Sequence, residues 1–119
     1  MNREIYKRLG IMEKAGMLTP AERQALETMI QLVEGEYGIK VVGDNGEIFI
    51  HHMAMLLLRH RNGQLVAPLD TATLASLRDD PRFAPSQEIA HAITQACGIR
   101  ITPDEAVYVR MHLCALMLT

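Results

Sequence analysis

Apolar residues along this chain recur every three or four positions, which is the spacing of an α-helix. Leu26, Met29, Ile30, Val33 and Tyr37 form one such series. No stretch alternates apolar and polar residues with the period of two that a half-buried strand requires. The pattern therefore predicts an all-α protein.

Six helices are expected, at residues 2–15, 20–37, 45–61, 70–78, 86–97 and 103–118. Three of them begin with a Thr or Asp that is followed three residues later by Glu. This is the spacing of a capping box, in which each of the two side chains accepts a hydrogen bond from the backbone N–H of the other residue. The three pairs are Thr19 with Glu22, Asp44 with Glu47, and Thr102 with Glu105.

A faint internal repeat relates the two halves of the chain. The segment 38–41, GIKV, is echoed by the segment 98–101, GIRI. His52 follows the first glycine by 14 positions (52 − 38), and His112 follows the second by the same distance (112 − 98). The predicted caps that follow the two glycines differ by two positions in register. The repeat indicates a pseudo-symmetric helical bundle with paired histidine positions.

Composition and charge narrow the class of protein. A chain of 119 residues, 49% of them hydrophobic, is long enough for one core and too short for two ordinary domains. Its net charge of −2 offers no basic surface for a phosphate backbone, so direct binding of nucleic acid is not expected. The longest apolar run, residues 53–58, is far shorter than a membrane span. Two cysteines outside any CxxC pair favour a reducing, cytoplasmic setting.

His52 and His112 each lie on or beside an apolar helix face. Each is therefore either a core histidine with satisfied nitrogens or a functional group. Arg59 lies seven positions after His52, two turns along the same face, where a guanidinium suits a phosphoryl group or a carboxylate. The other three histidines lack such a paired placement and are expected to be solvated or at the protein boundary. They are His51, His60 and His91.

Two stretches resemble the histidine motifs of the PTS regulation domain (PRD) family. Residues 52–63 read HMAMLLLRHRNG and are similar to the first motif, and residues 102–113 read TPDEAVYVRMHL and are similar to the second. The resemblance implies a compact five-helix bundle, here with an extra N-terminal helix. It divides the chain into an N-terminal helical extension at 1–18 and a PRD-like domain at 19–119.

The resemblance also implies a function. His52 and His112 match the two phosphoacceptor positions, and Arg59 matches the arginine that would stabilise the phosphate. The donor would be a phosphocarrier protein or a sugar-transport component of the phosphotransferase system. The domain would control transcription through a partner protein, as a homodimer or in a dimer with another PRD protein. No enzyme activity, cofactor, metal, nucleic acid or membrane is expected.

This chain departs from the family pattern in two respects. An acidic residue often precedes the first histidine of the family, whereas here the preceding residue is His51. Family members also commonly carry the domain in duplicate behind a module that binds DNA or RNA, and this sequence shows one copy and no such module.

Two other functions remain open at this stage. One is a dimerisation or interaction module that is no longer phosphorylated and that pairs with itself or with a related regulator. The other is an enzyme that gathers histidines, with Glu47 or Cys114, around Zn²⁺. The histidines of that hypothesis would be His51, His52 and His112. No HExxH or paired CxxC spacing supports the zinc site.

Overall fold

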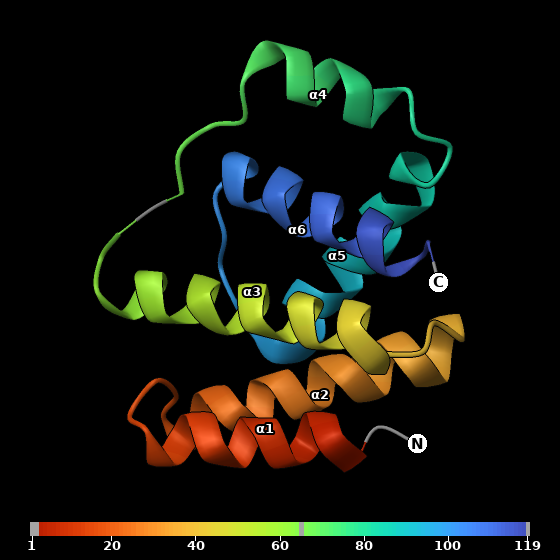
Figure 1. Cartoon of the computed structure of the whole chain (residues 1–119). Coiled ribbons are helices and arrows are strands. Elements are labelled where there is room, and N and C mark those ends of the chain that lie inside the picture. The colour runs from red at the N-terminus through yellow and green to blue at the C-terminus, as the bar shows by residue number, and fades with distance from the viewer. Residues whose placement is uncertain (1–2, 65, 119) are drawn as a thin grey trace.

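The computed structural model describes residues 3–64 and 66–118, and this part of the chain is helical, with no strand (Figure 1). The all-α prediction is confirmed. The helices are α1 (Arg3–Lys14), α2 (Pro20–Tyr37), α3 (Gly43–Arg61), α4 (Thr71–Arg78), α5 (Phe83–Cys97) and α6 (Pro103–Leu116). Most boundaries agree with the predicted ones to within two residues, and Asn2, the predicted start of the first helix, lies outside the described residues.

Two of the three predicted capping boxes are confirmed. Thr19 and Glu22 cap α2 reciprocally, and Thr102 and Glu105 do the same for α6. In both helices Pro occupies the first turn, where its missing N–H costs no hydrogen bond.

The third predicted box, at Asp44, is wrong. Helix α3 already begins at Gly43, and its N-cap is Val42, which makes no side-chain capping bond. Asp44 is therefore inside the first turn, and the Glu47 carboxylate forms an ion pair with Arg8 of α1 at 3.4 Å. A contact with a neighbouring helix has replaced the local one.

Helix α5 begins at Phe83, three residues before the predicted start. The prediction started the helix after Pro85, but this residue lies in the first turn, where proline is tolerated. The hydroxyl of Ser86 donates a hydrogen bond to the carbonyl of Phe83 within the same turn. The side chain of Arg82, just before the helix, is held by Asp80 at 2.9 Å.

The helices share one core. Helix α2 packs against α5, α5 against α6, and α3 against α6, while α1 packs against α2 and α3 (Figure 1). Ile5, Leu9 and Met12 of α1 are buried in the same cluster as the largest side chain of the core, Phe49 of α3. Helix α4 is more loosely attached, since Leu77 is its one buried residue.

The two halves of the internal repeat match each other better than the sequence indicated. The C-cap glycines of α2 and α5, Gly38 and Gly98, lie 60 positions apart and have left-handed φ values of 66° and 65°. The N-caps of the following helices, Val42 and Thr102, also lie 60 positions apart. The apparent shift of two positions came from taking Asp44 as the cap of α3. Each half of the bundle therefore presents its histidine from the same position of its last helix.

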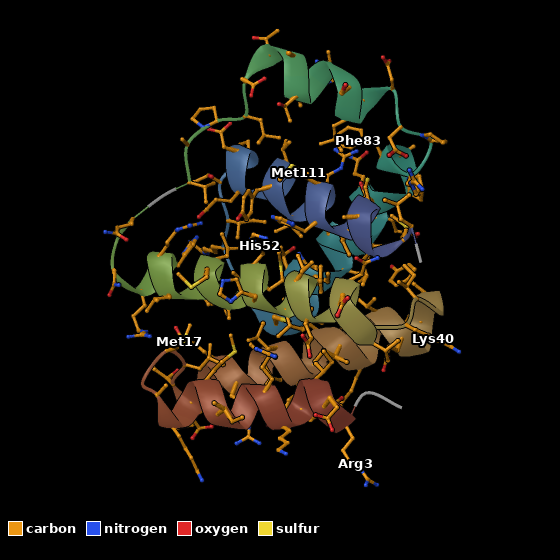
Figure 2. The ribbon with its side chains drawn as sticks, in the orientation of Figure 1. Arg3, Met17, Lys40, His52, Phe83 and Met111 are labelled. Carbon is orange, nitrogen blue, oxygen red and sulfur yellow. The ribbon has the colours of Figure 1, made fainter. Side chains whose placement is uncertain are left out.

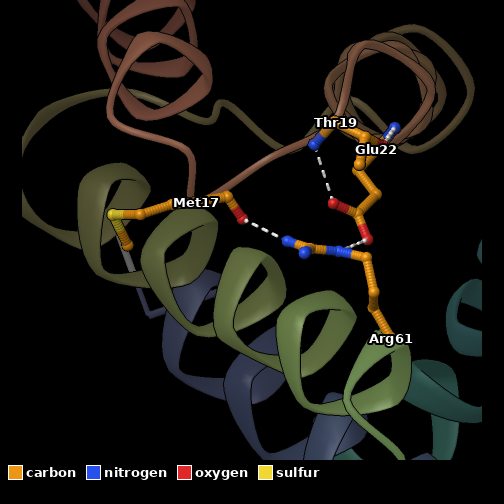
Figure 3. Close-up of polar contacts among 4 residues, drawn as sticks. All are labelled: Met17, Thr19, Glu22 and Arg61. Atoms are coloured by element: carbon orange, nitrogen blue, oxygen red, sulfur yellow. Dashed lines mark hydrogen bonds and ion pairs between the residues drawn. The ribbon is translucent and has the colours of Figure 1, made fainter.

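Residues at the start of α2 hold the C-terminal end of α3 on one side. The guanidinium of Arg61 donates to the Glu22 carboxylate at 3.1 Å and to the Met17 carbonyl at 3.2 Å (Figure 3). The same Glu22 carboxylate accepts the backbone N–H of Thr19 in the capping box, at 2.8 Å. One arginine thus fixes the α1–α2 turn to the end of α3.

The adjacent residue anchors α3 to α6 in a corresponding way. Nε2 of His60 lies 2.9 Å from Oε1 of Glu105, and the same oxygen accepts the backbone N–H of Thr102 at 2.8 Å. Glu105 is fully buried, and its second oxygen, Oε2, has no partner among the described residues. His60 and Arg61 therefore each bind the glutamate of one capping box. We call these four residues the α3 clamp: Glu22, His60, Arg61 and Glu105.

Candidate functional site

The two histidines singled out by the repeat lie against each other across the contact between α3 and α6. The imidazole rings of His52 and His112 stack with centroids 3.9 Å apart and planes inclined by 16°. His52 projects from α3 toward α6 (Figure 2). Two residues 60 positions apart in the chain thus form one site.

Tyr108 completes this site and was not among the predicted site residues. Its hydroxyl lies 3.1 Å from Nδ1 of His52, and its ring meets the ring of His112 edge-on at 4.5 Å. The sequence contained one signal for it, because Tyr108 precedes His112 by one helical turn and so shares its face. We call the three residues the histidine pair cluster: His52, Tyr108 and His112.

Both imidazoles of the cluster favour the neutral form. Burial, together with the charge that His52 would carry, lowers the pKa of His112 to about 4. The pKa of His52 is also lowered, first by burial and then by the neighbouring charges of His51 and Arg59. At neutral pH each ring therefore has an unprotonated nitrogen whose lone pair is available for nucleophilic attack.

The Nε2 atoms of the two histidines differ in how far they are open to solvent. Nε2 of His112 is enclosed by protein and has no hydrogen-bond partner among the described residues. His52 is partly exposed, and its Nε2 is neither enclosed nor hydrogen-bonded within residues 3–64 and 66–118. Of these two Nε2 atoms, that of His52 is therefore the more open to a phosphoryl donor.

Arg59 lies two turns from His52 on α3 and is partly exposed. Its positive charge acts on the imidazole, as the lowered pKa of His52 shows. Within the described part of the chain, no carboxylate forms an ion pair with the Arg59 guanidinium. This cation is thus available to an anionic group placed on the exposed side of α3.

The remaining histidines lie outside the cluster. His51 is exposed beside it, with its ring centroid 5.8 Å from that of His52, and His91 is exposed on α5. His60 lies at the boundary of the protein and belongs to the α3 clamp. Cys114, considered as a zinc ligand, is buried, and burial raises the pKa of its thiol.

Two negative findings apply to residues 3–64 and 66–118. No three residues of the types His, Cys, Asp or Glu come together there in a group that could hold a metal ion. None of the helices in this part has the length and hydrophobicity needed to cross a bilayer.

Comparison with known proteins gives one family and one curated relative. The family model described as "PRD domain" matches residues 27–116. The uncharacterized protein YhfY of Escherichia coli (strain K12) is 24% identical over 109 residues, which cover 92% of this chain and 91% of the relative. No solved structure matches significantly. The matched family region contains every residue of the histidine pair cluster.

Proposed function

Because this chain belongs to the PRD domain family, which consists of regulatory domains related to the sugar phosphotransferase system and not of enzymes, we propose that it senses the state of that system through histidine phosphorylation. The domain acts in the cytoplasm and controls transcription through a partner protein. The observation that carries the proposal is the stack of two neutral imidazoles at the two positions that match the family's phosphoacceptors.

The geometry supports different parts for the site residues in this proposal. His52 accepts the phosphoryl group first, because its free nitrogen is accessible. The Nε2 atom of His112 is enclosed, so this atom can accept a phosphoryl group only if the side chains around it rearrange. Arg59 pairs with the phosphate, which is possible because no carboxylate of the described chain occupies its guanidinium.

The phosphate would act through the contact between α3 and α6. Phosphorylation adds close to two negative charges beside a stacked aromatic pair that is partly buried. Such a charge has to be solvated or paired, so it disfavours the packing of α6 on the phosphorylated face of α3. The partner protein would bind one of the two resulting arrangements in preference to the other. With a net charge of −2, the domain itself is not expected to bind nucleic acid.

The test is transfer of phosphate from phosphoenolpyruvate through the general phosphotransferase enzyme and a phosphocarrier protein. The purified chain should take up phosphate, and His52→Ala should abolish most of the uptake. His91→Ala is the matched control, because His91 is an exposed histidine on another helix, and this variant should behave as the wild type. Absence of uptake with a donor system that phosphorylates a known PRD protein would refute the proposal.

A second candidate function is an interaction module that pairs with itself or with a related regulator and is not phosphorylated. Three large apolar side chains favour it, because each exposes more than half of its surface: Ile11 at 59%, Ile48 at 52% and Leu118 at 62%. Ile48 lies one turn before His52 on α3, so a dimer formed there would adjoin the cluster. Sedimentation of wild type and Ile48→Glu tests this function, which requires a wild-type dimer that the substitution weakens.

A further inference from the structure

One of the two ring nitrogens of His52 contacts a residue on the opposite helix. The hydroxyl of Tyr108 lies 3.1 Å from Nδ1 of His52 and occupies the direction in which that nitrogen would attack. The opposite nitrogen, Nε2, has no hydrogen-bond partner among the described residues and is not enclosed. The stack with His112 covers one face of the ring and limits its rotation.

We propose that His52 is phosphorylated through Nε2 and that Tyr108 is the positioning residue that enforces this choice. The inference rests on the proposed function in taking His52 as a phosphoacceptor. It adds the identity of the modified atom and a role for a tyrosine that touches neither the donor nor the phosphate.

The proposal requires the tautomer in which Nδ1–H donates this hydrogen bond to the Tyr108 oxygen. A neutral imidazole carries one proton, and Nε2 is a nucleophile only when that proton is on Nδ1. The Tyr108 oxygen can accept the Nδ1–H bond, and its own hydroxyl proton then points to solvent or to another acceptor. The edge-on contact of the Tyr108 ring with His112 holds the hydroxyl in place. A phenylalanine at this position would preserve the ring contact and remove only the hydrogen bond.

The transfer step balances with a donor of the phosphoramidate class, which includes phosphohistidine. The lone pair of Nε2 attacks phosphorus, a new N–P bond forms, and the N–P bond of the donor breaks with its electron pair returning to the donor nitrogen. The donor nitrogen takes up a proton. The positive charge that develops on the His52 ring is stabilised by the Nδ1–H bond to Tyr108 until that proton is released to water. No oxidant, reductant or metal is needed.

The first experiment measures the tautomer without any phosphate. Two-dimensional ¹H–¹⁵N NMR of the imidazole nitrogens at pH 8 should show His52 of the wild type mainly in the Nδ1–H form. In Tyr108→Phe the ratio of the two tautomers should shift toward Nε2–H by about two- to tenfold, the range expected for one neutral hydrogen bond. Tyr37→Phe is the control, since Tyr37 ends α2 away from the cluster. An unchanged ratio in Tyr108→Phe would overturn the proposal.

The second experiment uses inorganic phosphoramidate as the donor, so no protein partner is required. NMR should place phosphorus on Nε2 of His52 in the wild type, and Tyr108→Phe should give both isomers or a slower reaction. Phosphorus on Nδ1 in the wild type, no reaction at His52, or an unchanged outcome in Tyr108→Phe would each overturn the inference. Labelling by phosphoramidate without labelling by the phosphocarrier would instead refute the proposed function and leave the assignment of Nε2 standing.

Discussion

The α3 clamp should contribute measurably to stability, and His60 is the residue that tests it most directly. Nε2 of His60 is 2.9 Å from Oε1 of Glu105, whose side chain is completely buried. The other carboxylate oxygen has no partner among the described residues. In His60→Ala the carboxylate would keep only the hydrogen bond that it accepts from the backbone N–H of Thr102.

The expected cost follows from the loss of one hydrogen bond to a buried charged group. Such bonds contribute about 1.5–3 kcal/mol, and we expect His60→Ala to reduce the free energy of unfolding by that amount. For a domain of this size each kcal/mol lowers the unfolding temperature by roughly 3–6 °C. The change should be visible in urea titrations followed by circular dichroism at 222 nm, as a lower midpoint with an unchanged slope.

Two further variants, His91→Ala and Glu105→Gln, distinguish the stability contributed by the α3 clamp from a general effect of losing a histidine. His91→Ala removes an exposed histidine from α5 and should change the stability by less than about 0.5 kcal/mol. Glu105→Gln makes the buried group neutral, so adding His60→Ala to it should cost less than His60→Ala costs in the wild type. If His60→Ala were as stable as His91→Ala, the clamp would not hold α3 to α6 as described.

The remaining predictions concern pH, backbone packing and the phosphate. Because the pKa of His112 is lowered in the folded state to about 4, the unfolded chain binds the extra proton first, so stability should fall as the pH drops from about 6.5 to 4. His112→Gln should flatten this part of the pH profile of urea midpoints. Gly46→Ala should destabilise the fold by about 1–3 kcal/mol, because the added Cβ would lie 2.7 Å from the backbone carbonyl carbon of Val41. Gly35→Ala, in open space on α2, should stabilise it by about 0.5–1 kcal/mol in the same assay. Arg59→Ala should shorten the lifetime of the phosphorylated form while leaving the unfolding midpoint of the free form within about 0.5 kcal/mol.

The helices could be predicted from the sequence because their determinants are local. Apolar spacing and a capping pair act over three or four residues, and both Thr-Pro starts behave as that rule expects. The same rule was wrong at Asp44, since Glu47 there contacts Arg8 of another helix. The repeat likewise indicated that His52 and His112 occupy equivalent positions, which is a statement about pattern and not about contact.

The site itself was decided by tertiary structure. The hydrogen bond between His52 and Tyr108 spans 56 positions of the chain, and that between His60 and Glu105 spans 45. No spacing rule reaches that far, because such contacts depend on how α3 and α6 pack and on which side chains then face each other. Packing also determined the chemistry, since burial between helices is the first cause of the lowered pKa of both His52 and His112. The sequence alone thus determined which residues form helices, and the packing of those helices determined which imidazole nitrogens are hydrogen-bonded or enclosed.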